Sequence, residues 1–227
     1  MKFLITILLA VLIGGGGTFF WLYYGGFEKE RSEAIAFIDI YGDYNDAAEK
    51  VEFLVHLPGT ENNVDRSELL SLLNSILTED MEPERRESLA RLAYSNLDSL
   101  KDEIEAAKVA QEDLYSVLQD LDSAVGTFKS MELQGKAGEI VLLSRKRAEV
   151  SARIASALSE TNEHTHAIIT RILSEKGALS HAHIVEINSA TESAEDRFVM
   201  LESLYSELMR MKAEVDTLFA EFVQIAL

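Results

Sequence analysis

The residues of this sequence best suited to chemistry lie in Glu163-His164-Thr165-His166. Glu163 and His166 form a Glu-x-x-His pair, the half-motif with which helical bundles hold di-iron sites. Such a site needs a second copy of the motif and two more inward carboxylates, and neither occurs at a matching position. Residues two apart on a helix point about 200° apart, so His164 and His166 cannot chelate one ion from one face. Glu163 and His166 are therefore weak candidates for metal ligands. The favoured alternative is that they are ordinary solvated or core side chains, and we expect no cofactor.

Polar residues interrupt otherwise apolar helical stripes at Gln111, Thr161, Thr165 and Arg197. They could line a small polar cavity that binds a ligand. The alternative, which we favour, is structural: a single polar group on an apolar seam commonly fixes its register and its number of partners. On the same interpretation, Arg197 extends its charge to solvent or pairs with an acid.

Sequence motifs typical of catalysis are missing. The chain has no glycine-rich phosphate loop, no His-Glu-x-x-His and no Gly-x-Ser-x-Gly, and it has no cysteine. Two oxygen-rich stretches, residues 39–46 and 60–65, do not have the spacing of an EF-hand calcium loop. We therefore expect that the protein is not an enzyme.

Helices must position all these residues, because apolar side chains recur at alternating spacings of three and four over long stretches. The clearest heptad seam covers residues 90–128, and matching stripes cover residues 139–176 and 180–226. Pro83 suits the first turn of the seam helix, which should run to about residue 129. We expect a break at residues 133–138, which hold Gly135 and Gly138, and a C′ glycine at Gly177. The seams predict an all-α fold, an elongated antiparallel bundle of three to four helices with coiled-coil-like heptad seams.

A further amphipathic helix is predicted at residues 27–57, with an apolar stripe from Phe37 to Val55, and Pro58-Gly59 should end it. Asp65 then begins a short helix that is apolar over most of its circumference. Such a piece must be buried in the body, against a partner or at the membrane surface. The candidates for partner contact are Leu69, Leu72, Leu73 and Ile76.

The N-terminus carries an uncharged run from Phe3 to Tyr24. At 1.5 Å per residue these 22 residues span roughly 33 Å, enough for the ~30 Å hydrocarbon core of a bilayer. Aromatic residues that prefer the headgroup level crowd its end, including the interfacial anchors Trp21, Tyr23 and Tyr24. We expect a transmembrane anchor at residues 1–26, which Gly25 and Gly26 end or bend. The alternative is a signal sequence, cleaved or uncleaved.

Ala10, Gly14 and Thr18 repeat every four residues within that run. Small residues on one face let another membrane helix approach closely, so this face predicts packing against a partner span. The alternative is a merely flexible anchor. The short, signal-like N-terminus favours a cytoplasmic N-terminus, with the bulk of the chain extracytoplasmic, periplasmic or on the cell surface.

Charge argues against two classes of partner and supports one packing. A formal net charge of −18 argues against binding nucleic acid or the face of an anionic membrane, since both need clustered Lys and Arg. Residues 83–128 carry ten acids and five bases, and residues 179–227 carry nine acids and three bases. Residues 129–178 carry eight bases and six acids. The middle helix should therefore lie between two neighbours of opposite charge.

These features divide the chain into the anchor at 1–26, a juxtamembrane helix plus a short apolar helix at 27–82, and the long bundle at 83–227. We favour a non-catalytic accessory or scaffold subunit of a membrane complex. The architecture also resembles the extracytoplasmic helical bundles of chemoreceptors and sensor kinases, which implies a ligand-binding module. Those receptors return through the membrane, and no second apolar span follows here, so such a sensor would signal through a partner. A homo-oligomeric coiled-coil subunit is the third hypothesis.

Overall fold

The computed structural model describes residues 2–55, 71–72, 75–76, 81–177 and 180–227. From residue 28 onward it also describes the side chains, apart from those of residues 183, 186–188, 190–195 and 198. Within these residues the chain forms helices and no strands, which confirms the predicted all-α fold. The helices are α1 (Lys2–Leu54), α3 (Pro83–Val125), α4 (Met131–Ser174) and α5 (His181–Ala226).

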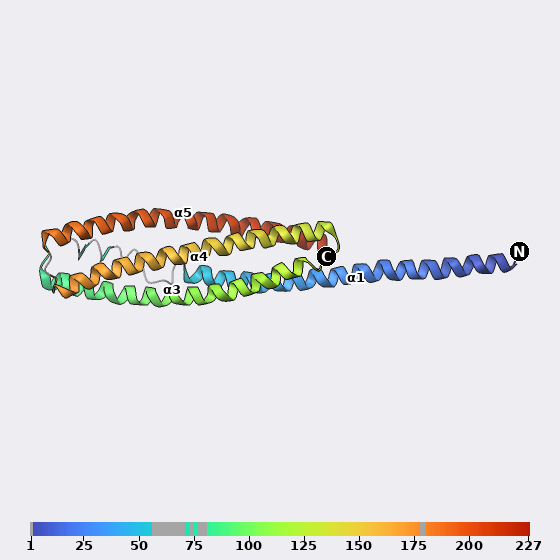
Figure 1. The fold of residues 1–227 in the computed structure, drawn as a ribbon, viewed down its shortest axis with the longest axis horizontal. Helices are drawn as coiled ribbons and strands as arrows, with labels where there is room; N and C mark the ends of the chain where they lie inside the picture. The colour runs from blue at the N-terminus through green and yellow to red at the C-terminus, as the bar shows by residue number, and fades with distance from the viewer. Residues whose placement is uncertain (1, 56–70, 73–74, 77–80, 178–179) are drawn as a thin grey trace.

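The helices form one elongated bundle (Figure 1). α3 packs along α1 on one side and along α4 on the other, and α4 also packs along α5. α1 and α4 run in one direction while α3 and α5 run in the other, so the neighbours are antiparallel, as short connections favour. α1 enters at one end and stops about halfway, so it covers only that half of the bundle.

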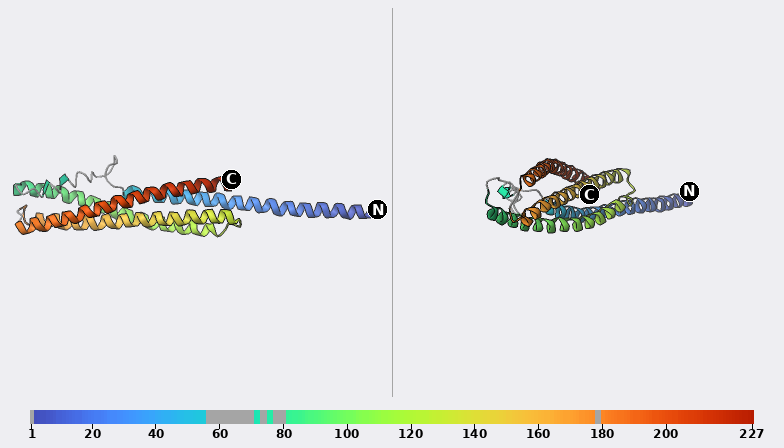
Figure 2. Two further views of the ribbon diagram at one scale, coloured as in Figure 1. Left: turned by 90° about the horizontal axis from the view of Figure 1, so that it is seen from above. Right: turned by 60° about the vertical axis from the view of Figure 1, so that its left-hand side comes forward.

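α1 is a single helix of 53 residues that passes through Gly25 and Gly26 without interruption. The predicted end or bend at these glycines is therefore wrong. A helical glycine costs only about 1 kcal/mol relative to alanine, and the segments on both sides favour helix. As a result, the N-terminal half of α1 continues straight beyond the end of the bundle (Figures 1 and 2).

The predicted anchor at residues 1–26 lies outside the residues whose side chains are described. Within the described part of the chain, no helix has both the length and the apolar character needed to cross a membrane.

The turn between α3 and α4 lies at residues 126–130, not at 133–138 as predicted. α3 ends at Val125, and Ser130 caps α4 by accepting a hydrogen bond on its hydroxyl from the Leu133 backbone N–H at 3.4 Å. Gly135 and Gly138 lie inside α4, where Leu133 and Ala137 are buried. Burial of this helix face and the serine cap together outweigh the low helix propensity of two glycines.

The end of α4 is a Schellman turn, shifted by one residue from the prediction. Lys176 takes the C′ position with φ 53°, and Gly177 follows as C″ with φ 74° and donates from its N–H to the Ile172 carbonyl at 3.1 Å. Glycine is required at 177 because a Cβ there would lie 2.1 Å from the Pro83 carbonyl oxygen. Arg86, which is buried, donates to the carbonyls of Gly177 and Ile76 at 3.0 Å each. This end of the bundle is thereby closed around one arginine.

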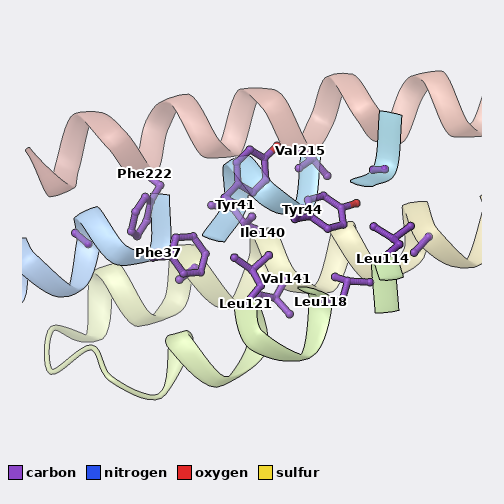
Figure 3. Packing of buried hydrophobic residues seen from close by; sticks show 14 of the residues in the cluster. Phe37, Tyr41, Tyr44, Leu114, Leu118, Leu121, Ile140, Val141, Val215 and Phe222 are labelled. Atoms are coloured by element: carbon purple, nitrogen blue, oxygen red, sulfur yellow. The ribbon is translucent and has the colours of Figure 1, made fainter. Parts of the chain in front are cut away.

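The predicted apolar stripes form the core. From Phe37 to Val55 the stripe of α1 is buried, and its side chains interdigitate with those of the other three helices (Figure 3). The contacting residues include Leu114, Leu118 and Leu121 of α3, Ile140 and Val141 of α4, and Val215 and Phe222 of α5. Burial of each large side chain contributes about 1.5–3 kcal/mol, so α1 is an integral layer of this half.

The predicted charge complementarity of the middle helix is also found. Bases of α4 pair with acids of both neighbours: Arg145 with Asp122 of α3 at 3.3 Å, Lys136 with Glu221 of α5 at 2.7 Å, and Arg153 with Glu207 of α5 at 4.0 Å. Exposed pairs of this kind contribute at most about 1 kcal/mol each. Their main effect is on which helices become neighbours.

Candidate functional site

A fully buried arginine is the most unusual polar feature of the bundle. Arg147 of α4 has no solvent exposure, and its Nε donates to Glu52 Oε1 of α1 at 2.6 Å. Its Nη1 donates to Asn45 Oδ1 of α1 at 3.2 Å, whereas its Nη2 has no hydrogen-bond acceptor among the described residues. Burying a charge is costly unless it is paired and hydrogen-bonded. The hydrogen bonds of Arg147 therefore fix the axial position of α4 relative to α1.

Tyr44 completes the inner side of this polar cluster. Its ring lies 5.8 Å from the Arg147 guanidinium carbon, and its hydroxyl donates to the Ser144 carbonyl at 3.1 Å. Burial raises the pKa of Tyr44 to about 12, although the Arg147 charge opposes the shift. Burial works to lower the pKa of Arg147, but the hydrogen bond to Glu52 and the nearby Tyr44 outweigh it and leave that pKa raised. At neutral pH Tyr44 is therefore uncharged and Arg147 is positively charged.

The outer side of the cluster reaches α5. Lys212 Nζ lies 2.9 Å from Glu49 Oε1 and 3.9 Å from Glu52 Oε2. The hydrogen bond and charge of Lys212 hold the pKa of Glu49 below its usual range. The Tyr41 ring stacks on Phe219 at 3.8 Å, and burial, followed by the Asp216 charge, raises the pKa of Tyr41. The cluster thus connects α1 to both α4 and α5.

A second contact holds α1 where it leaves the bundle. Glu30 Oε1 accepts a hydrogen bond from the Ser130 backbone N–H at 2.6 Å, in the turn between α3 and α4. Just inside this level Phe37, Phe128 and Phe222 form an aromatic cluster, with ring centroids 4.9–5.7 Å apart. Two of the three pairs, both with Phe128, are edge-to-face. Aromatic pairs of this kind add about 0.5–1.5 kcal/mol to the stabilisation from burial. The exit of α1 is therefore fixed both laterally and in height.

These groups are suited to positioning a helix and not to turning over a substrate. The cluster offers no nucleophile beside a general base, and its charges are consumed in mutual pairs. An arginine keeps its proton at every physiological pH, so it cannot serve as an acid or a base. What the arrangement can do is fix the position of α1 along the bundle and resist its sliding.

The predicted metal candidates do not form a site in the structure. Glu163 is exposed on α4 and accepts a hydrogen bond from Ser159 at 3.4 Å. His166 Nε2 lies 3.3 Å from Asp98 Oδ1 of α3, and its ring lies 4.4 Å from that of Tyr94. Nowhere in the described part of the chain do three His, Asp or Glu side chains gather around a common point.

The four polar seam residues differ in the contacts that they make. Gln111 Nε2 donates to the Ala148 carbonyl of α4 at 3.1 Å, which links two helices. Thr161 and Thr165 bond back to carbonyls of their own helix, and Arg197 is partly exposed. A shallow groove of about 260 Å³ between α3 and α4 is lined by Gln111 but by none of the other three. The bond from Gln111 to α4 is a contact of the kind that the structural interpretation predicts.

Most of the predicted membrane and partner contacts lie outside the described side chains. This applies to Ala10, Gly14, Thr18, Trp21, Tyr23 and Tyr24, whose backbone belongs to α1, and to Leu69 and Leu73. Leu72 is partly exposed. Ile76 is fully buried against Ala90, Ala93, Leu97, Ile169 and Ile172, so its side chain is already covered by the bundle.

Sequence reasoning missed the cluster around Arg147, although a signal was present. Ile140, Arg147 and Ile154 are spaced by seven residues and all are fully buried, so a charged residue occupies a core position of the heptad. In the sequence, Arg147 stands out only as part of the basic run Arg145-Lys146-Arg147. Its partner Glu52 is seven residues from Asn45, on the edge of the apolar stripe of α1.

Comparisons with known proteins give no relative: the chain matches no protein-family model, no curated protein and no solved structure.

Proposed function

We propose that this is a single-span membrane protein, a non-catalytic accessory or scaffold subunit whose helical rod stands outside the cytoplasm. One observation carries the proposal: α1 runs unbroken from Lys2 to Leu54, so the uncharged run and the bundle core belong to the same helix. The apolar run of 22 residues is long enough to cross a bilayer. A helix held in the core by Arg147 and at its exit by Ser130 would orient the whole rod relative to the membrane.

The small-residue face of the span supplies the contact with the complex. Ala10, Gly14 and Thr18 recur at a spacing of four, which brings them onto one side of the helix. In lipid, such a face lets a second helix pack closely and replaces the missing hydrophobic driving force. The partners we propose are multi-span membrane proteins.

The test is co-purification from the native membrane in mild detergent, with native mass and composition determined together. Gly14→Leu should reduce the recovered partners, because the larger side chain separates the two helices. Gly16→Leu is the matched control, since it makes the same change about 200° around the helix. Equal partner recovery from both variants and from the unmodified protein would contradict packing on this face.

A sensor bundle is the second candidate, and the buried cluster is the observation that favours it. Glu52 of α1 is bound to Arg147 of α4 and lies near Lys212 of α5, so an axial shift of α1 would have to rearrange both other helices. A small molecule that raises the thermal midpoint of the detergent-solubilised protein would support this function. Self-association of the rod, the third possibility, would give homo-oligomers in the native mass.

A further inference from the structure

We infer that the bundle end formed by the α3–α4 turn and the last turn of α5 rests on the lipid headgroups of the bilayer from which α1 emerges. The inference depends on the proposed function, because it requires the apolar run of α1 to lie in the membrane. It adds a second membrane contact, made by a part of the chain about a hundred residues away from the anchor in sequence.

The first step is the height of this end above the bilayer. The Glu30 side chain holds the backbone of Ser130, so the turn lies at the level of Glu30 on α1. Glu30 is six residues beyond Tyr24, where the predicted run of residues 3–24 ends, and three residues beyond Phe27, the last residue before the first charge at Glu28. These separations correspond to about 4.5–9 Å along an unbroken helix. The headgroup layer adds roughly 5–8 Å beyond the hydrocarbon on each side. The turn therefore lies where the headgroups end.

The second step is the direction in which the side chains of this end point. α4 runs away from the turn, and Cα–Cβ bonds in a helix tilt toward its N-terminus. Met131, the first residue of α4, is therefore directed toward the bilayer. It is 88% exposed, more than any other large hydrophobic side chain that the structure describes.

The third step is the chemistry of the end face. Leu227 and Ile225 lie at the end of α5 and are 61% and 42% exposed, so apolar groups from two helices lie at the same end (Figure 1). Exposed charges there are mixed, with Lys129 in the turn and Glu132 in the first turn of α4. An apolar face of mixed charge suits the headgroup layer of a zwitterionic membrane, where no net positive charge is needed.

Two contacts, the helix in the bilayer and the end face on its surface, would hold the rod upright. α4 has 44 residues and runs the length of the rod, which gives about 66 Å at 1.5 Å per residue. The opposite end, closed by Arg86 and Gly177, would then stand at that height above the headgroups.

The absence of cysteine makes the experiment direct, because a single introduced cysteine is the only labelling site. Full-length Met131→Cys is labelled with an environment-sensitive fluorophore and reconstituted into phosphatidylcholine nanodiscs with and without a headgroup-labelled quencher lipid. Val109→Cys is the control on the rod, since Val109 is 63% exposed well inside α3. Ile13→Cys, within the apolar run, reports on the anchor itself.

A fluorophore at position 131 should show blue-shifted emission, and its emission should fall when the nanodiscs contain the quencher lipid. A fluorophore at position 109 should show neither effect. A fluorophore at position 13 should be shielded from water. Emission at 131 that matches 109 while position 13 is shielded would overturn the inference and leave the proposed anchor standing. A fluorophore at position 13 that behaves as in water would overturn the anchor and the inference together.

Discussion

Tyr44 and Arg147 determine how α1 is seated, and both are polar groups that the fold takes wholly out of water. Tyr44 contributes a buried aromatic ring and one hydrogen bond from its hydroxyl. Arg147 carries a charge whose hydrogen bonds to Glu52 and Asn45 fit one register of α1 on α4. Sliding α1 by one turn would break both hydrogen bonds to Arg147, and a buried guanidinium that is left unpaired costs about 3–5 kcal/mol. The polar residues thus supply the specificity that the apolar stripe lacks.

Tyr44 should make the protein sensitive to alkaline pH. Its folded-state pKa of about 12 lies above the ordinary value of 10.0 expected in the unfolded chain, so folding favours the protonated form. The resulting stabilisation is complete below pH 10 and is lost as the pH rises toward 12, at about 1.4 kcal/mol per pKa unit.

Tyr44→Phe should therefore lose about 1 kcal/mol at neutral pH, from its missing hydrogen bond, yet fall less steeply in stability between pH 10 and 12. Urea denaturation of the detergent-solubilised protein at several pH values measures both effects. Parallel pH profiles for the variant and the unmodified protein would contradict the assignment.

Removal of one partner of the buried ion pair should be far worse than removal of both. Glu52→Leu alone leaves the Arg147 charge unpaired inside the bundle and should lower the free energy of unfolding by about 3–5 kcal/mol. Adding Arg147→Met replaces the pair by packed apolar side chains and should recover most of that loss. Additive losses in the urea denaturation of the double variant would show that the pair does not act as a unit.

At the scale of the elements, the glycines show which helix ends are set by local sequence. Gly135 and Gly138 lie inside α4, and apart from the adjoining residues and the nearby backbone of α4 itself, no atom lies within 4 Å of the position that a Cβ would take at either residue. Gly177, in contrast, abuts Pro83 in a left-handed conformation. The same residue type therefore has opposite requirements within a helix and in the turn that ends it.

Gly135→Ala and Gly138→Ala should each stabilise the protein by about 0.5–1 kcal/mol, because they improve helix propensity without a steric cost. Gly177→Ala should instead cost about 2 kcal/mol or more, from backbone strain and the clash with Pro83. Thermal unfolding by circular dichroism compares all three. A stabilised Gly177→Ala variant would disprove the tight contact between α3 and the α4 cap.

The helices themselves could be predicted because a heptad stripe is a long, redundant signal: the stripe of α3 from Ala90 to Leu121 is buried as expected. Helix ends are harder to predict. A glycine inside a well-packed helix looks the same in sequence as a glycine that ends one, which is why the breaks expected at Gly25 and Gly138 are wrong. The cluster at Arg147 required knowing which helix lies opposite, since Glu52 is 95 residues away in sequence.

For the whole molecule, the helix order creates a rod with two different ends. One end holds the α3–α4 turn and the exit of α1, and the other is closed by Arg86 and the Gly177 turn (Figure 1). The chain has a net charge of −18. Lys136 and Arg145, two of the bases of α4, form ion pairs with acids of the neighbouring helices.

The most direct test of the proposed function is the native mass of the tagged full-length protein, extracted from its own membrane in mild detergent, together with the identity of the chains that accompany it. We expect stoichiometric multi-span partners, because the small-residue face and the fixed rod are suited to a subunit that positions others. A protein recovered only as a monomer or as a homo-oligomer, with no other chain in constant ratio, would contradict the account.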